Sequence, residues 1–282
     1  MPDSPLQSLI NGQQAEHISI RDRGFQYGDG CFETIRVLSN EAILWDDHLK
    51  RLERACAMLR LSVDLSLLER EVSSLLDSNS NPDVILRITV TRGQGGRGYS
   101  PSKEGGCTRV LQLIPYSAPD TATGARAVLC KHRLASSSSL AGIKHLNRLD
   151  QVLASGEIPP DCDEGLCLDS EGYVIEGCKS NILLAMGDSL FTPNLATSGV
   201  EGVMLNHLMH ELKNRGMAVE RKCIDLDQLL TADEILLCNS VFGVWPLMEI
   251  CNEGWNCVSQ DKPLTSAALD IHAALFNGDS DE

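Results

Sequence analysis

The amino-acid sequence predicts a two-domain protein of mixed α/β (α+β) structure. A chain of 282 residues is too long for one typical hydrophobic core, so two domains, or one large α/β unit, are expected. Runs with strand periodicity alternate with runs of helical periodicity along the whole chain. Residues 117–124 form the strongest linker candidate. We therefore expect a small N-terminal α/β domain at residues 1–116 and a larger C-terminal domain at residues 125–282.

Composition and charge narrow the class of protein. Hydrophobic residues make up 43% and charged residues 22%, as in ordinary globular proteins. The formal net charge of −15 argues against a nucleic-acid or anionic-membrane surface, because the necessary excess of Lys and Arg is missing. No apolar run approaches membrane-spanning length, and residues 1–5 lack the features of a signal peptide. The eleven cysteines are scattered without a CxxC pair, so we expect a reduced, cytoplasmic protein.

Turn residues and strand patterns predict the sheet of the N-terminal domain. Asn11-Gly12 suits the positive φ angles of a type I′ hairpin turn between residues 9–10 and a return strand at residues 18–20. Residues 21–30 are expected to form a glycine-punctuated loop. Further strands are expected at residues 31–37, 42–44, 84–92 and 110–116.

Apolar residues at helical spacing predict two helices in the same domain. The first follows Asp46 or Asp47, either of which can cap it. Arg51 falls on the flank of its apolar stripe, where periodicity alone predicts a solvated surface arginine. The second helix is expected at residues 66–76.

Residues 93–98 match the GxGxxG pattern of dinucleotide-binding folds. That motif needs a helix directly after the glycines to receive a pyrophosphate at its N-terminus. The following residues include Pro101 and two glycines and cannot begin a long helix, so we reject a nucleotide-binding module. A flexible loop that presents Arg97 and Tyr99 to a substrate carboxylate is the preferred interpretation, and a plain hairpin tip is the alternative.

The C-terminal domain is predicted to continue the mixed pattern. Its strands are expected at residues 125–131, 164–168, 173–178, 181–185, 189–192, 235–238 and 243–250. Its helices are expected at residues 146–154, around 205–212, at 225–230 and at 265–276.

Two residues of this half carry candidate chemistry. Lys144 follows Gly142 and Ile143 in an apolar setting, where desolvation can turn a lysine into a nucleophilic amine or Schiff-base former; a solvated loop lysine is the alternative. Glu176 lies near the inner end of a mostly apolar strand, a costly position unless the carboxylate is paired. On sequence alone an exposed edge position is the more common explanation for Glu176.

Weaker candidates lie in the surrounding elements. The glycine-rich turn before the helix at about residue 205 offers backbone N–H groups and a positive dipole end, which suits a phosphate. His207 and His210 have a spacing that can bind metal, but no third ligand is evident and we expect no metal site. Ser240 lies at a strand end, and Thr34 by position is an ordinary strand former.

Together these features meet the requirements of pyridoxal 5′-phosphate. The aldehyde of this cofactor needs a lysine, and its pyridine nitrogen needs a carboxylate that keeps the ring protonated. Its phosphate needs an arginine, hydroxyls and helix-start amides. No single feature is specific, but the combination indicates a pyridoxal-phosphate enzyme.

The sequence resembles the fold-type IV (class IV aminotransferase-like) pyridoxal-phosphate enzymes, and within them the aminodeoxychorismate lyase branch. The resemblance extends from residue 9 to about residue 246. It is carried by residues 29–36, 48–52, 92–100, 141–148 and 238–246. The Arg-Gly-Tyr-Ser and Gly-Ile-Lys-His-Leu-Asn-Arg segments are those of the lyase branch. The resemblance implies a two-domain fold in which the larger C-terminal domain is a cofactor-binding pseudo-barrel.

The same resemblance implies roles for individual residues. Lys144 would bond to the cofactor's aldehyde and act as the proton-transfer base, while Glu176 would face the pyridine nitrogen. Thr34 is a candidate for assisting the proton transfer. The groups that would hold the phosphate are Arg51, Ser240 and the amides of Val203 and Met204. The side chains that would lie by the substrate's carboxylates are Arg97 and Tyr99.

The implied activity is the conversion of 4-amino-4-deoxychorismate to 4-aminobenzoate and pyruvate, a step of folate biosynthesis, by a cytoplasmic homodimer. An aminotransferase acting on D- or branched-chain amino acids is the alternative within the family. Branched-chain aminotransferases place a tyrosine where this chain has Arg148, and D-amino-acid transaminases place one where Phe32 stands. The departure at Phe32 weakens the D-amino-acid transaminase alternative.

Overall fold

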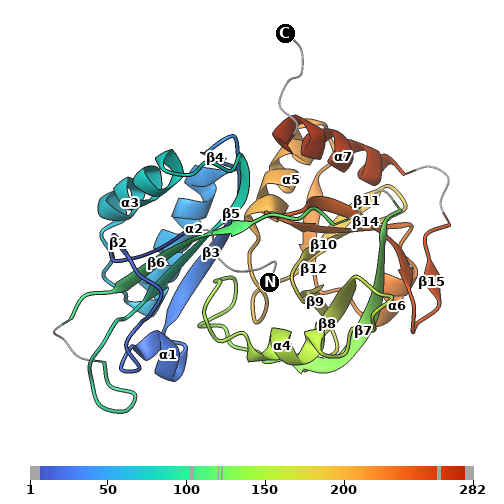
Figure 1. Ribbon diagram of the computed structural model, residues 1–282. Coiled ribbons are helices and arrows are strands. Elements are labelled where there is room, and N and C mark those ends of the chain that lie inside the picture. Colours follow the sequence, from blue (N-terminus) through green and yellow to red (C-terminus); the bar gives the residue numbers. More distant parts are fainter. Residues whose placement is uncertain (1–6, 102–104, 120, 122, 259–261, 277–282) are drawn as a thin grey trace, which may run out of the picture. The chain divides into compact units, whose positions relative to one another are not determined.

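The computed structural model describes residues 7–101, 105–119, 121, 123–258 and 262–276 (Figure 1). The chain divides into two compact units. The first unit comprises Met1–Ser117 and Ile143–Asn147, and the second comprises Ala118–Gly142 and Arg148–Glu282. The short segment Ile143–Asn147 therefore belongs to the first unit although both of its flanks belong to the second. Residues 1–5 and two positions of the expected linker, 120 and 122, lie outside the described residues.

A six-stranded antiparallel sheet forms the first unit, in the order β2-β1-β6-β5-β3-β4. Its strands are β1 (Gln7–Ile10), β2 (Gln13–Gln14), β3 (Gly30–Leu38), β4 (Glu41–Ala42), β5 (Asp83–Thr91) and β6 (Thr108–Pro115). Asn11 and Gly12 have φ angles of 51° and 77°, which confirms the hairpin turn. The expected return strand at residues 18–20 is wrong, because a two-residue turn returns the chain at once into β2.

The helices of this unit are α1 (Arg23–Tyr27), α2 (Trp45–Leu59) and α3 (Leu65–Asp77). Helix α1 lies inside the stretch expected to be a loop, and the Asp22 carboxylate caps it by accepting a 2.8 Å hydrogen bond from the Gly24 amide. Asp46 and Asp47 do not cap α2, since its N-cap is Leu44 with a φ of 54°. They occupy the first turn, where negative charge favours the helix end electrostatically.

The second unit contains a nine-stranded sheet with the order β12-β11-β10-β13-β14-β7-β8-β9, and β15 pairs with β14. Its strands are β7 (Ala125–Leu134), β8 (Glu164–Asp169), β9 (Val174–Gly177), β10 (Asn181–Met186), β11 (Ser189–Pro193), β12 (Val219–Lys222), β13 (Glu234–Asn239), β14 (Gly243–Ile250) and β15 (Trp255–Asn256). The Val174 amide in β9 donates a 2.8 Å hydrogen bond to the carbonyl of Ile224, just beyond β12. The two outer strands thus meet, and the curled sheet confirms the expected pseudo-barrel.

The interior of this sheet is filled by aliphatic and aromatic side chains, among them Leu166, Ile182, Leu237 and Trp245. The helices of the unit are α4 (Leu149–Ser155), α5 (Val203–Asn214), α6 (Leu226–Leu230) and α7 (Pro263–Phe276). Helix α4 lies on the crossover between the parallel strands β7 and β8, as such connections require. Within the described ranges no helix is both long and apolar enough to cross a lipid bilayer.

Candidate active site

Lys144 lies on a short segment that pairs with the beginning of β3. The Phe32 amide donates a 2.9 Å hydrogen bond to the Lys144 carbonyl, and the Leu146 amide donates one of 2.9 Å to the Gly30 carbonyl. Gly30 allows this approach, because a Cβ there would lie 2.8 Å from the Leu146 side chain. The Lys144 ammonium lies 4.6 Å from the centroid of the Phe32 ring. Backbone pairing on both sides therefore fixes the position from which the half-buried Lys144 side chain extends.

Arg51 is buried, and the prediction of a solvated surface arginine is wrong. Only 9% of its surface is exposed, and its Nε donates a 2.8 Å hydrogen bond to Oε1 of Glu33 on β3. The Arg51 guanidinium also bonds to Oε2 of Glu33, so the contact is bidentate. The helical pattern could not show this, because the partner carboxylate comes from a different element.

His48 completes a buried cluster around the same carboxylate. Its Nδ1 lies 2.6 Å from Oε2 of Glu33. Burial opposes ionisation of Glu33, but the charge and hydrogen bonds of Arg51, with help from His48, lower the pKa of Glu33 to about 2. Burial lowers the pKa of His48, so the neutral imidazole donates from Nδ1. Sequence reasoning missed both Glu33 and His48, although each lies in a segment that carries the family resemblance.

Thr34 lies on β3 two residues after Phe32 and is half-buried. Because side chains alternate along a strand, Thr34 shares the sheet face of Phe32 and lies opposite the face of Glu33. Thr34 is therefore separated from the cluster of Arg51, Glu33 and His48. It lies on the same sheet face as the Phe32 ring, which the Lys144 ammonium contacts.

Arg97 and Tyr99 are both exposed on the glycine-rich loop after β5, Tyr99 to 88%. Arg23 anchors this loop by donating hydrogen bonds of 2.9 Å and 3.2 Å to the carbonyls of Gly98 and Tyr99. The same guanidinium is paired with Asp29 at 2.8 Å. In the described part of residues 98–107 no helix follows the glycines. Sequence reasoning missed Arg23, because no pattern marks a residue whose partners are backbone carbonyls 75 and 76 positions away.

Glu176 is buried in β9 with 4% exposure, so the edge-exposed interpretation is wrong. Its Oε2 accepts a 2.8 Å hydrogen bond from the Val200 amide, and its Oε1 accepts one of 3.3 Å from the Gln151 side chain. Gly199 has a φ of 83°, and a Cβ there would lie 3.2 Å from Oε2 of Glu176. A glycine at this position therefore leaves room for the carboxylate.

The segment that holds Glu176 also pairs with the chain just before Lys144. The Gly142 amide donates a 2.9 Å hydrogen bond to the Gly199 carbonyl, and the Glu201 amide donates one of 3.0 Å to the Gly142 carbonyl. Val200, whose amide bonds to Glu176, lies between these two contacts. These two hydrogen bonds form a short ladder between Gly142 and residues 199–201. The ladder fixes Gly142, the residue directly before the segment that carries Lys144.

Val203 and Met204 are the first two residues of α5, and both are buried. The N-cap is Gly202, which has no side chain with which to cap the helix. The first backbone N–H groups of a helix have no intrahelical acceptor and carry a partial positive charge. Such a helix start suits an anionic ligand when a second group adds specificity.

Asn181 connects this helix start to the end of β13, where Ser240 lies. Its side chain donates a 2.8 Å hydrogen bond to the Val200 carbonyl, and a Cβ at Gly202 would lie 1.9 Å from its Oδ1. In the sheet Asn181 pairs with Cys238, two residues before the half-buried Ser240. Sequence reasoning missed Asn181, because only strand register brings it opposite β13.

The model of the family Amino-transferase class IV matches residues 30–250. The chain belongs to this family.

Two relatives and one solved structure are similar to this chain over most of its length. The aminodeoxychorismate lyase of Vibrio harveyi is 35% identical over 86% of this chain and 90% of its own length. A putative branched-chain-amino-acid aminotransferase of Methanocaldococcus jannaschii is 31% identical over 87% and 88%. The crystal structure of 4-amino-4-deoxychorismate lyase from Pseudomonas aeruginosa has a TM-score of 0.90 and 36% identity, and it covers 96% of this chain and 99% of its own.

Proposed function

We propose that this enzyme is a pyridoxal-phosphate-dependent lyase that converts 4-amino-4-deoxychorismate to 4-aminobenzoate and pyruvate. The similarity to proteins named as this lyase supports the assignment, at 35% identity for the Vibrio harveyi relative and 36% for the solved Pseudomonas aeruginosa structure. The lyase-type segments at residues 92–100 and 141–148 support it as well.

The donor set fits the cofactor. Glu176 is a buried carboxylate that accepts hydrogen bonds from two N–H groups. Such donors favour the ionised form of a carboxylate, which can accept a hydrogen bond from a protonated pyridine nitrogen. The amides of Val203 and Met204, with Ser240 and Arg51, match the requirements of a phosphate dianion. When bound, pyridoxal phosphate supplies an electron sink for the bond-breaking step.

The observation that carries the proposal is the short chain path from Lys144 to the ladder that holds Glu176. Gly142 bonds to both Gly199 and Glu201, and Val200 between them binds the Glu176 carboxylate. Two residues of extended chain span about 7 Å, so Lys144 begins close to this ladder whatever the arrangement of the units. The proposal requires the Lys144 side chain to reach a ring held by Glu176.

The side chains have distinct tasks in the proposed reaction. In its unprotonated form Nζ of Lys144 accepts the proton from C4 of the substrate, and Thr34 assists this transfer. Arg97 and Tyr99 bind and orient the substrate's carboxylates. The bond between the ring and the enolpyruvyl oxygen then breaks, and the leaving enolpyruvate takes up one proton in place of the one lost from C4, so that it is released as pyruvate. Aromatisation of the remaining ring drives the step.

The test is an assay with 4-amino-4-deoxychorismate as the only organic substrate. The lyase releases pyruvate and 4-aminobenzoate without any 2-oxo acid. The aminotransferase alternative is supported by the Methanocaldococcus jannaschii relative, which is named as a putative branched-chain-amino-acid aminotransferase. It would be established by a requirement for an oxo-acid acceptor, with transfer of the amino group from a D- or branched-chain amino acid.

A matched pair of lysine variants tests the role of Lys144. Lys144→Ala is expected to lose the visible absorbance of the bound cofactor and nearly all turnover, while Lys213→Ala, on the last turn of α5, retains both. Borohydride treatment followed by peptide mapping should label Lys144 in the wild-type enzyme. Substantial lyase activity in Lys144→Ala contradicts the assignment.

The enzyme is further proposed to act in the cytoplasm as a homodimer in which both subunits shape each active site. Light scattering of the purified protein measures its mass in solution directly. A monomer with full lyase activity would refute the shared site.

A further inference from the structure

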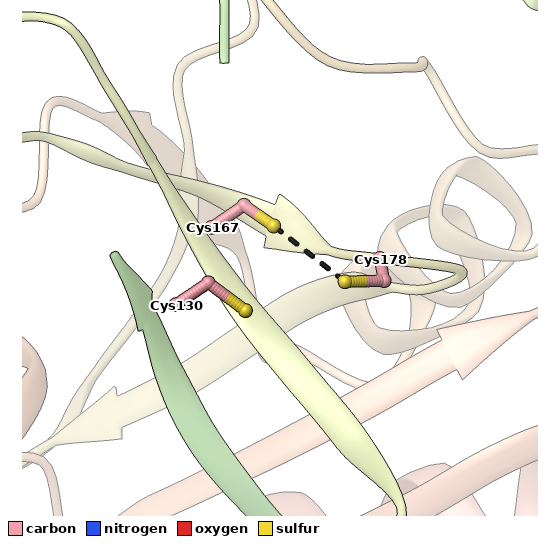
Figure 2. Close-up of side chains that lie close together, drawn as sticks. All are labelled: Cys130, Cys167 and Cys178. Carbon is pink, nitrogen blue, oxygen red and sulfur yellow. Dashed lines mark hydrogen bonds between the residues drawn. The ribbon is translucent and has the colours of Figure 1, made fainter. Parts of the chain in front are cut away.

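Three cysteines that lie far apart in the sequence converge in the second unit. Cys130 lies on β7, Cys167 lies on β8, and Cys178 directly follows β9 (Figure 2). Their sulfur atoms all lie within 4.8 Å of one another, and those of Cys167 and Cys178 are 3.8 Å apart. Cys130 and Cys167 are buried, whereas Cys178 is partly exposed and opens the cluster toward solvent.

The backbone makes room for this sulfur cluster. A Cβ at Gly165, on β8, would lie 2.6 Å from Sγ of Cys130 and 3.0 Å from Sγ of Cys178. Any side chain at position 165 would therefore push two of the thiols away. The glycine allows the three sulfurs to share one space instead of packing separately as small hydrophobic groups.

The spacing of the sulfurs is that of ligands around one metal ion. Zn²⁺ binds thiolates at about 2.3 Å, which in tetrahedral geometry places two sulfurs about 3.8 Å apart. The distance between the sulfurs of Cys167 and Cys178 is 3.8 Å without any ion. Small rotations of Cys130 would complete a three-sulfur site.

We propose that Cys130, Cys167 and Cys178 form a binding site for one thiophilic d¹⁰ cation of the Zn²⁺ class. Three thiols lose three protons and form three metal–sulfur bonds, so the complex carries one negative charge and no electron is transferred. Soft thiolate ligands select such ions over Mg²⁺ or Ca²⁺. Among the described residues no fourth Cys, His, Asp or Glu joins the cluster, which leaves one coordination position for water.

Cys178 is the most exposed of the three proposed ligands, since Cys130 and Cys167 are both buried. The neighbouring Glu164 carboxylate accepts hydrogen bonds from Ser180 and the Gly165 amide. Cys178 is thus the first ligand that an incoming ion meets.

An ion at this site would link three neighbouring segments of the sheet. It would hold β7, β8 and the residue after β9 together, and the bonds would form only in the folded chain. Binding to the folded state alone raises stability by mass action. We therefore expect the melting temperature to rise with metal concentration.

The experiment uses the reduced holoenzyme after removal of metals with a chelator. Cd²⁺ is added, because cadmium thiolates absorb in the ultraviolet, and Zn²⁺ is then added as the competitor. The expected result is absorbance that saturates at one Cd²⁺ per chain, competes with Zn²⁺ and is accompanied by proton release. No saturable absorbance at one equivalent overturns the proposal.

The chain supplies a matched control for the location of the ion. The sulfurs of Cys162 and Cys251 form a separate pair 3.2 Å apart. The double variant Cys162→Ser, Cys251→Ser should retain the Cd²⁺ signal, whereas Cys178→Ser should weaken Cd²⁺ binding at least tenfold. The reverse pattern places the ion elsewhere and refutes the site.

X-ray absorption of the wild-type cadmium complex keeps the test decisive even if a variant misfolds. Three sulfur ligands on one Cd²⁺ support the site, and two or fewer contradict it. Gly165→Ala adds a steric check, since its Cβ would occupy the space between two of the sulfurs and should abolish binding.

Discussion

Arg51 on α2 donates a 2.8 Å hydrogen bond from Nε to Oε1 of Glu33 on β3, and both residues are buried. Replacing Glu33 by Gln removes the charge that compensates the guanidinium. Because an unpaired buried charge is costly, the apoenzyme should lose about 3 kcal/mol of unfolding free energy. Chemical denaturation measures this loss.

The control is Asp83→Asn, which breaks the pair with Arg36. The Asp83 side chain is 44% exposed, so that variant should lose less than about 1 kcal/mol. Equal losses of unfolding free energy in the two variants would show that burial does not make the Glu33–Arg51 pair more important for stability than the exposed pair. If Arg51 also holds the cofactor's phosphate, Glu33→Gln will retain less pyridoxal phosphate after dialysis, a separate measurement.

Burial raises the pKa of Glu164 from 4.5 to about 7. Between those values the unfolded chain has released a proton that the folded chain keeps, so stability falls as the pH rises through this window. The full loss at high pH is about 3 kcal/mol by linkage. In Glu164→Gln this contribution to the pH dependence should vanish between pH 5 and pH 8, as denaturation midpoints will show. An unchanged slope would contradict the shifted pKa.

Arg23 anchors the loop that carries Arg97 and Tyr99 through two backbone carbonyls. Arg23→Gln should free the loop and raise the rate of tryptic cleavage after Arg97 about tenfold, the equivalent of one charged hydrogen bond. KM for the substrate should rise with little change in kcat. Arg21→Gln, at an exposed position nearby, is the control and should leave both measurements unchanged.

Gly199 and Gly216 have similar φ angles of 83° and 80°, but only Gly199 has close neighbours. A Cβ at Gly199 would lie 2.8 Å from Ile175, whereas nothing lies within 4 Å of one at Gly216. Both alanine variants should therefore lose about 1 kcal/mol through backbone strain, and Gly199→Ala about 1–3 kcal/mol more. Only Gly199→Ala should alter the cofactor's spectrum, since it displaces the strand of Glu176. Identical melting curves would exclude the contact.

Much of the secondary structure follows from local pattern. Strands such as β14 and helices such as α3 were predictable, because alternation and helical spacing depend only on neighbouring residues. The turn at Asn11-Gly12 was predictable for the same reason. Its return strand was not, since register decides where pairing begins.

The candidate site was predictable only as a set of residue types. Lys144 and Glu176 were identified through motifs, yet the burial of Glu176 depends on Val200 and Gln151. The exposure predicted for Arg51 failed because its partner lies 18 positions away, on a strand. Helical periodicity describes one face of one element and gives no information about which residues of other elements pack against that face.

The sequence by itself determined the family and most strands and helices, and it supplied the lysine and the carboxylate as candidates, because these depend on residue identity and short-range spacing. Only the tertiary structure decided that segment Ile143–Asn147 joins the first unit, that Glu33 binds Arg51, and that three scattered cysteines share one space. Each of these depends on strand register or on contacts between distant segments. Such contacts form through burial and pairing in three dimensions, for which the linear order of residues carries no local signal.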